Sequence, residues 1–229
     1  MTQAAGTGNP GQQYGCRTED LFMIHALYRD AFGRAPGLVQ RTDPGDAAKV
    51  NRVADHLHEI LGALRSHHMH EDTLFWDKIE QREPESGEDV ARMREQHRDI
   101  ERRIAGLLDM AEAWRTDPRQ KDALAEGLKR LEEKLLLHLD DEERTVRLAA
   151  SRVLTQEEWS KAGELGRREM PKDRQLVQLG YILHCAPSEE LRQGLWHKLP
   201  MPVRLAYRAM GRRAFRREWE ALYGEKLPK

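Results

Sequence analysis

Apolar side chains recur along most of this chain at alternating spacings of three and four residues, the period of a helix with one face turned toward a core. The sequence is rich in Ala, Leu, Glu and Arg, which favour helices, so the pattern predicts a mostly helical protein. Four long stretches carry the pattern, at about residues 18–32, 43–81, 88–114 and 117–150.

Residues that favour helix ends mark the boundaries of these stretches. Gly33 is expected to end the first helix, with a proline and a second glycine a few residues beyond. Asp43 before Pro44 is a helix N-cap followed by proline at the first helical position, and Asp117 before Pro118 repeats the combination. Because the connections are short, neighbouring helices should be antiparallel, which predicts an all-α, up-down-up-down four-helix bundle.

The chain after residue 150 is expected to form a helical extension. Thr155 and Glu158 have the spacing of a capping box, and Gly224 is a helix-ending glycine after the last helix. Shorter helices between them should break near Pro171, Pro187, Pro200 and Pro202. We therefore expect a disordered leader at 1–17, rich in Gly, Gln, Asn and Pro, a bundle at 18–150, and an extension at 151–229 that packs on the bundle.

Composition narrows the choice of compartment and partners. Lys and Arg number 38 against 39 Asp and Glu, so the overall balance gives no reason to expect a nucleic-acid partner. Cys16 and Cys185 are the two cysteines and form no CxxC pair, which argues against a disulfide scaffold and favours a reducing, cytoplasmic location. No apolar run approaches membrane-spanning length, and the first residues lack the pattern of a secretion signal.

Polar residues interrupt the apolar stripe of every predicted bundle helix. Each helix places one histidine in its stripe, and the second and fourth helices add a glutamate four residues later, on the same face. Near mid-helix, these side chains should meet at a similar height in an antiparallel bundle. The six residues are His25, His67, Glu71, His97, His138 and Glu142.

Imidazoles and carboxylates in an apolar core cost several kcal/mol each when they lack partners. A pair of metal ions would offset that cost, and a set of histidine and carboxylate donors without thiolate suits iron or manganese, and also zinc. Glu71 and Glu142 could each bridge two ions. Six protein ligands leave open positions for a small ligand such as dioxygen.

Some of these polar residues could have a structural role, and four neighbouring residues are further candidates for the metal site. A single core histidine is more often hydrogen-bonded than ligating, but four interruptions in register favour metal. His68 and Asp72 lie about 100° around the helix from the first pair and are the alternatives if the register differs by one. His70 lies at the edge of the stripe, and Glu101, one turn after His97, is a further candidate ligand or hydrogen-bond acceptor.

The order of these residues resembles the hemerythrin-like, or HHE cation-binding, domain. The segment "HHMHEDTLFWDKIE" is similar to the second-helix motif of that family, and the resemblance covers about residues 18–150. It implies a non-haem di-iron centre, oxo- or hydroxo-bridged, that binds or activates dioxygen, nitric oxide or peroxide, or senses redox state or iron. The same six residues, from His25 to Glu142, would be its ligands. The segment after the bundle also looks like the tails of some bacterial members.

The chain departs from the oxygen-carrying members of that family. Those members have two histidines one turn apart on the third helix, where this chain has Met93 and Glu101 on either side of His97. Their fourth-helix histidine and carboxylate are also more widely spaced than His138 and Glu142. A centre poorer in histidine favours higher iron oxidation states, so the resemblance implies catalysis or sensing rather than simple oxygen carriage.

Two alternative functions remain open at this point. One is a di-iron oxygenase or oxidase acting on a small organic molecule, which requires a pocket beside the metals. The other is an iron-dependent regulatory module that uses the arginine-rich segment near the C-terminus. An amphipathic helix of that kind can contact membrane or nucleic acid, but we expect its apolar face to pack on its own domain. The arginines in question are Arg204, Arg208, Arg212, Arg213, Arg216 and Arg217.

Overall fold

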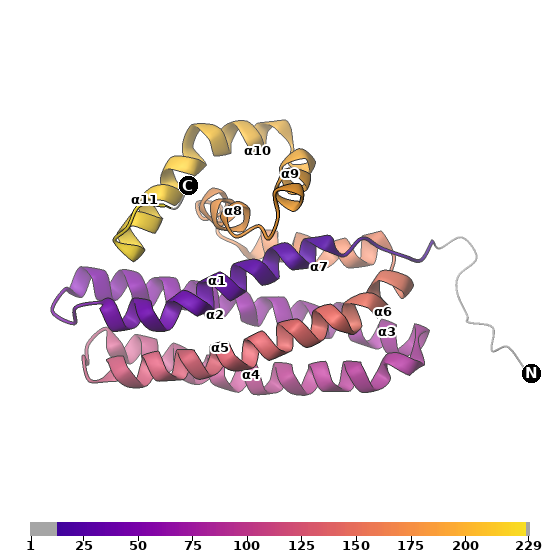
Figure 1. Ribbon diagram of the computed structural model, residues 1–229, viewed down its shortest axis with the longest axis horizontal. Helices are drawn as coiled ribbons and strands as arrows, with labels where there is room; N and C mark the ends of the chain where they lie inside the picture. The colour runs from indigo at the N-terminus through magenta and orange to yellow at the C-terminus, as the bar shows by residue number, and fades with distance from the viewer. Residues whose placement is uncertain (1–12, 228–229) are drawn as a thin grey trace, which may run out of the picture.

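A computed structural model describes residues 13–227, and these residues form helices and loops without a β-strand. The four long helices are α1 (Glu19–Arg41), α2 (Ala47–Leu74), α4 (Gly87–Trp114) and α5 (Gln120–Arg144). Helix α1 packs against α2 and α5, and α4 packs against the same two helices. Successive long helices run in opposite directions (Figure 1). The predicted antiparallel four-helix bundle is thus confirmed.

Two separate apolar clusters fill the core of the bundle. The larger one includes Leu57, Leu107 and Trp114 and occupies the half of the bundle that contains the α1–α2 and α4–α5 loops. The smaller one includes Trp76, Val90 and Val146 and occupies the opposite end. Buried histidine and glutamate side chains of the four long helices, among them His25, Glu71 and His138, lie between these clusters along the helices. The apolar core therefore has a polar layer in its middle.

The first helix is longer than the sequence predicted. Instead of ending at Gly33, α1 continues through Pro36 to Arg41. Proline removes one backbone hydrogen bond from a helix interior. Ala35, Leu38 and Val39, which flank Pro36, are almost fully buried in the larger cluster. Their burial stabilises the last two turns of α1 and offsets the hydrogen bond that the proline removes.

The second and fourth predicted helices are each divided in two. Helix α2 ends at Leu74 and α3 spans Trp76–Arg82; α5 ends at Arg144 and α6 spans Val146–Val153. Phe75 and Thr145, which lie between the two parts, have φ of −114° and −118°, well away from the usual helical value of about −63°. The expectation of continuous helices was therefore wrong. Each break lies within four residues of a buried glutamate, Glu71 or Glu142. Neither break has a glycine or proline that would have predicted it from the sequence.

Helix starts also differ from the sequence signals. Asp46 caps α2, since its side chain accepts a hydrogen bond from the backbone of Lys49. Asp43, the predicted cap, instead accepts from the backbone N–H of Gly45 in the preceding turn. A short 3-10 helix, Pro84–Ser86, leads into α4. These shifts move helix ends by a few residues and leave the topology unchanged.

The extension consists of α7 (Gln156–Glu169), α8 (Gln175–His184), α9 (Glu189–Lys198), α10 (Met201–Ala206), the π-turn η2 (Tyr207–Gly211) and α11 (Arg212–Tyr223). The predicted capping box at Thr155 and Glu158 is confirmed, as is the left-handed Gly224 after the last helix. Helix α7 packs on α2, and α8 packs on α1 and α11. The extension therefore covers the α1–α2 flank of the bundle (Figure 1).

Helices α8 and α11 approach each other closely around a third apolar cluster, which includes Tyr181, Phe215 and Trp219. Gly180 makes this approach possible, because a Cβ there would lie 2.5 Å from the Phe215 ring. Arg174 then ties the extension to the bundle. Its Nη2 donates hydrogen bonds of 2.7 Å to Glu59 on α2 and to Glu218 on α11.

The predicted leader at 1–17 lies mostly outside the described residues, which begin at residue 13. Its last part is attached to α6. The backbone N–H groups of Gly15 and Cys16 donate to the carbonyls of Leu154 and Ser151, at 2.9 and 3.0 Å. Within residues 13–227, no helix combines the length and the apolar composition that a bilayer crossing requires.

Candidate metal centre

Seven imidazole and carboxylate side chains form the polar layer in the middle of the bundle. All four long helices contribute to it, and most of the side chains are almost completely buried, with His25 and His138 at 0% exposure. His67 is the most accessible, with a side chain that is 14% exposed. The seven residues are His25, His67, His68, Glu71, His97, His138 and Glu142.

The first of two groups in this layer consists of two imidazoles and two carboxylates. One ligand atom from each of its members lies within 4.8 Å of the others. His25 Nε2 is 3.2 Å from Glu142 Oε2, and His67 Nε2 is 3.2 Å from Glu71 Oε1. Three helices, α1, α2 and α5, supply this group.

The second group consists of three imidazoles, from His68, His97 and His138, whose ring nitrogens also lie within 4.8 Å of one another. The rings of His68 and His97 are stacked with centroids 4.0 Å apart. Both carboxylates reach toward this group as well. Glu71 Oε2 is 3.7 Å from His97 Nε2, and Glu142 Oε2 is 3.7 Å from His138 Nε2. The glutamates therefore lie between the two groups.

The structure brings the six residues singled out by the stripe pattern into one layer, and it adds His68. The sequence offered His68 only as an alternative to His67. Both reach the layer because consecutive residues of α2 point about 100° apart and so extend toward the two adjacent groups. The adjacent pair of histidines was the sequence signal for this arrangement.

The other candidates lie outside the two groups. His70 faces α7, where its Nε2 is 3.0 Å from Glu169 Oε1. Glu101 is exposed and forms an ion pair with Arg65, at 2.8 Å. Each lies on the wrong side of its helix, so neither can share an ion with the seven. Asp72 lies just outside the second group, as a partner of His97 rather than as a member.

Hydrogen bonds on the outer side hold two of the rings with their Nε2 atoms facing inward. His25 Nδ1 is 2.8 Å from Glu143 Oε1, which also accepts from Arg29. His138 Nδ1 is 2.9 Å from Gln96 Oε1. Because these partners are acceptors, they hold a ring proton on Nδ1 and leave Nε2 directed into the layer.

His97 is held in the same way by a two-step chain. Its Nδ1 is 2.8 Å from Asp72 Oδ1, and the same oxygen accepts a 2.6 Å hydrogen bond from the indole of Trp76. Trp76 is buried and belongs to the smaller apolar cluster. No pattern in the sequence indicates the supporting roles of Glu143, Gln96 and Trp76, since acidic and amide residues beside core histidines are also common on exposed helix faces.

Five inward-facing atoms of the layer are buried without a hydrogen-bond partner within the described chain. They are Nε2 of His25, His67 and His68, and Oε2 of Glu71 and Glu142. Buried polar atoms are nearly always satisfied, so this concentration calls for a group that accepts several lone pairs at once. A metal cation is such a group.

Burial and mutual interactions shift the protonation of the layer strongly. Burial lowers the pKa of His67 to about 3, and it holds the pKa values of His68 and His138 well below the ordinary value. Burial together with the neighbouring Glu142 charge raises the pKa of Glu71. Burial opposes ionisation of both Glu142 and His25, but their hydrogen bond and opposite charges lower the pKa of Glu142 and raise that of His25. A metal ion would take the place of the proton on His25 Nε2. Neutral imidazoles are the form that binds metals.

Distances within the layer fit metal coordination. Neighbouring ligand atoms around an octahedral ion with bonds of about 2.1 Å lie roughly 3.0 Å apart. The contacts of 3.2 Å in the first group, and the 3.3 Å between His97 Nε2 and His138 Nε2, are close to that value. Nitrogen and carboxylate oxygen donors suit iron, manganese or zinc.

An antiparallel four-helix bundle with imidazoles and carboxylates converging in its core belongs to the class of helical-bundle metal-binding proteins. The family model described as hemerythrin HHE cation binding domain matches residues 18–147, more than half of the chain. The chain therefore belongs to the hemerythrin HHE family. No curated protein and no solved structure matches it.

Proposed function

We propose that this protein holds two iron ions in the polar layer and uses them to bind or activate a small ligand of the dioxygen, nitric oxide or peroxide type, or to sense redox or iron state. The observation that carries the proposal is the pair of ligand groups with two carboxylates between them. One ion alone would leave three or more buried donors without a partner.

The two positions would differ in their protein ligands. His25 and His67 would serve one ion, and three histidines would serve the other, with Glu71 and Glu142 bridging both. The first group offers two imidazoles and the second three, so the ion held by His25 and His67 would have fewer protein ligands and more room for a small ligand. The position served by His25 and His67 is therefore the better candidate for a small ligand.

The residues around the layer would tune and protect it. Glu143, Gln96 and Asp72 hold protons on the outer ring nitrogens, which keeps the inner lone pairs available. The apolar clusters on both sides limit entry of water. Iron in such a site would supply reversible electron transfer, which zinc, lacking redox chemistry, does not.

The presence of His68 in the layer raises the number of histidines from four to five. With six ligands, the centre looked poor in histidine, which favoured catalysis or sensing over oxygen carriage. A fifth imidazole from α2 makes up for the histidine that α4 lacks beside His97. The histidine count therefore gives no reason to prefer catalysis over reversible binding, and the proposal covers both.

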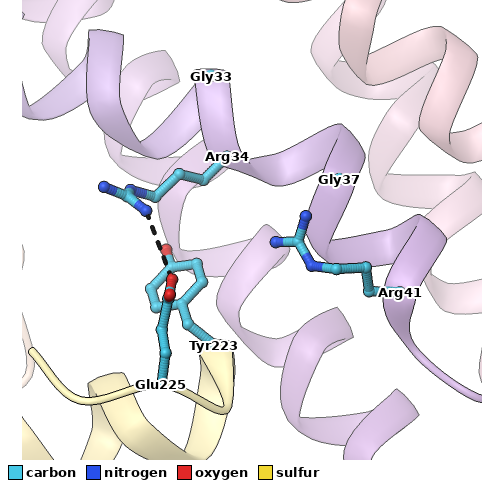
Figure 2. Close-up of a pocket in the computed structure, with 6 residues that line it drawn as sticks. All are labelled: Gly33, Arg34, Gly37, Arg41, Tyr223 and Glu225. Carbon is cyan, nitrogen blue, oxygen red and sulfur yellow. Dashed lines mark ion pairs between the residues drawn. The ribbon is translucent and has the colours of Figure 1, made fainter.

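The oxygenase alternative requires a substrate pocket beside the metals. A cavity of about 480 Å³ opens on α1 where the end of α11 meets it (Figure 2). Its nearest lining residue on α1, Gly33, lies eight residues, or roughly 12 Å, along the helix from His25, so the cavity does not supply that pocket. Its lining consists of Gly33, Arg34, Gly37, Arg41, Tyr223 and Glu225.

Metal analysis of aerobically purified protein tests the proposal directly. We expect about two irons per chain, with near-ultraviolet charge-transfer bands. His67→Ala and Glu142→Ala should lose most of the metal, and His68→Ala should reduce it toward one ion. His70→Ala is the matched control, since its ring faces α7. Full metal content in the first two variants would contradict the ligand assignment, and full content in the third would remove His68 from the set.

A further inference from the structure

Helices α10, η2 and α11 follow one another without a break, and the two sides of this segment differ sharply. On the inner side, Phe215 and Trp219 are buried against α8. On the outer side, Met201, Leu205 and Met210 are exposed by 59%, 57% and 62%. Three large apolar side chains therefore face solvent on one helical segment. Of the apolar face that was expected to pack on the domain, Trp219 does so, but Met210 does not.

The same segment carries a concentrated positive charge. Residues 204–217 contain six arginines and no acidic residue, in a chain whose formal net charge is −1. Five of the six arginines, all except Arg204, are exposed. None of the six forms an ion pair with any residue in 13–227.

Arginines in the bundle behave differently. Arg94 pairs with Asp77 and Glu80, and Arg115 pairs with Asp55, as most arginines of α1 to α6 do with nearby acids. The six arginines of residues 204–217 thus lack the internal ion-pair partners that most arginines of the bundle have. Unpaired guanidinium groups are strong ligands for phosphate and carboxylate groups of a partner.

An aromatic side chain lies at the end of this surface. Trp196, on α9, is half-buried, and the Arg208 guanidinium lies 5.2 Å from the centre of its ring. Tryptophan and arginine side chains of this kind suit the headgroup region of a bilayer, where an apolar ring and a polar edge are both accommodated.

The position of the segment leaves it accessible. Helix α10 lies on the outer edge of the extension, with α8 between it and the bundle (Figure 1). A flat surface could therefore reach α10 and η2 without meeting the long helices. No rearrangement of the bundle would be needed for contact.

We propose that the outer face of α10, η2 and the start of α11 docks on the surface of an anionic lipid bilayer. The arginines would contact lipid phosphates and carboxylates, while Met201, Leu205 and Met210 enter the boundary between headgroups and acyl chains. Nucleic acid fits less well, because a phosphate backbone gives no apolar environment for three exposed side chains. This proposal does not depend on which metal the bundle holds.

Co-sedimentation of the full-length, metal-loaded protein with vesicles tests the proposal. We expect binding to vesicles of phosphatidylcholine mixed with phosphatidylserine, no binding to phosphatidylcholine alone, and weaker binding as salt is raised. Failure to bind the phosphatidylserine vesicles at low salt would overturn the proposal.

Paired variants separate the specific surface from general charge. Arg212→Gln combined with Arg213→Gln should weaken binding about 25-fold, at about fivefold for each arginine near the surface. Arg98→Gln combined with Arg102→Gln changes net charge equally on the exposed face of α4 and should have little effect. Equal losses in the two double variants would contradict the assignment of this face.

The apolar contribution distinguishes a bilayer from nucleic acid. Leu205→Ser should weaken vesicle binding about fivefold or more, because one leucine side chain would no longer enter the bilayer. Metal content should be unchanged in all these variants, which shows that the bundle is intact. Tighter binding to duplex DNA than to the anionic vesicles, with no effect of Leu205→Ser, would replace the bilayer with nucleic acid and overturn the proposal.

Discussion

At the scale of single residues, the polar layer depends on side chains outside it as much as on its own members. Asp72 is 41% exposed, yet it accepts from both the His97 ring and the Trp76 indole through one oxygen. The buried indole fixes the carboxylate, and the carboxylate fixes the tautomer and the angle of the imidazole. Groups of this kind commonly change metal affinity by 10- to 100-fold.

Replacement of Asp72 by asparagine tests this chain of contacts. Asp72→Asn keeps the size of the side chain but removes the charge that favours a proton on His97 Nδ1. We expect metal affinity to fall by about 10- to 100-fold, measured by competition with a chelator. Asp77→Asn removes an exposed carboxylate one turn away, which pairs with Arg94, and should leave affinity unchanged. Equal metal affinities for Asp72→Asn and the wild type would show that the contacts from Trp76 through Asp72 to His97 do not affect metal binding.

The spacing of apolar residues predicted the members of the polar layer that lie on the apolar stripe of each helix. It could not predict a member that lies beside the stripe, such as His68. A stripe assigns one residue to each turn, so His67 excluded His68 as long as a single line of contact was assumed. Two ligand groups side by side make the layer wider than a stripe. The partners of His25 and His138 come from Glu143 and Gln96, whose pairing depends on helix rotations that no spacing encodes.

At the scale of helices, tertiary burial overrides the local signals for helix ends. Pro36 lies within α1 because the residues around it fill the core, and the breaks at Phe75 and Thr145 occur without a helix-breaking residue. Where a signal uses side-chain hydrogen bonds, it works. The capping box at Thr155 forms as predicted because both of its bonds lie within four residues of sequence.

The capping box supplies a pH-dependent prediction. The hydrogen bond from Arg82 holds the pKa of Glu158 at about 2, against partial burial, which acts to raise it. Because the folded pKa is below the ordinary 4.5, this stabilisation is fully present above about pH 4.5 and is lost as pH falls toward 2. Glu158→Gln should therefore lower the free energy of unfolding near neutral pH by about 1–2 kcal/mol.

Urea unfolding at several pH values measures this effect. The difference between Glu158→Gln and the wild type should shrink as the wild-type carboxyl becomes protonated below about pH 4. Glu157→Gln changes the adjacent, exposed glutamate and should have little effect at any pH. A difference that stays constant down to about pH 3 would mean that the ionised form of Glu158 contributes nothing.

At the scale of the whole molecule, the bundle and the extension have separate apolar cores. The bundle encloses the polar layer between two clusters, and α8 and α11 enclose a third around Tyr181 and Phe215. Arg174 is one of the main polar links between them, and its pairs with Glu59 and Glu218 raise its pKa above the ordinary value. The sequence predicted that the extension packs on the bundle, but not that it lies along the α1–α2 flank, since its contacts join residues more than 40 apart.

Removal of the Arg174 link should loosen the extension and spare the metal centre. Arg174→Met leaves the carboxylates of Glu59 and Glu218 close together without a cation, at a cost of about 1–3 kcal/mol given their partial exposure. Amide hydrogen exchange should accelerate in α8 and α11, while exchange in α4 and the bound-metal content stay unchanged. Arg192→Met breaks an exposed pair within α9 and serves as the control. Loss of iron together with faster exchange in α4 would instead mean that bundle and extension unfold as one unit, because a cooperative structure cannot lose one part while the other keeps its protection.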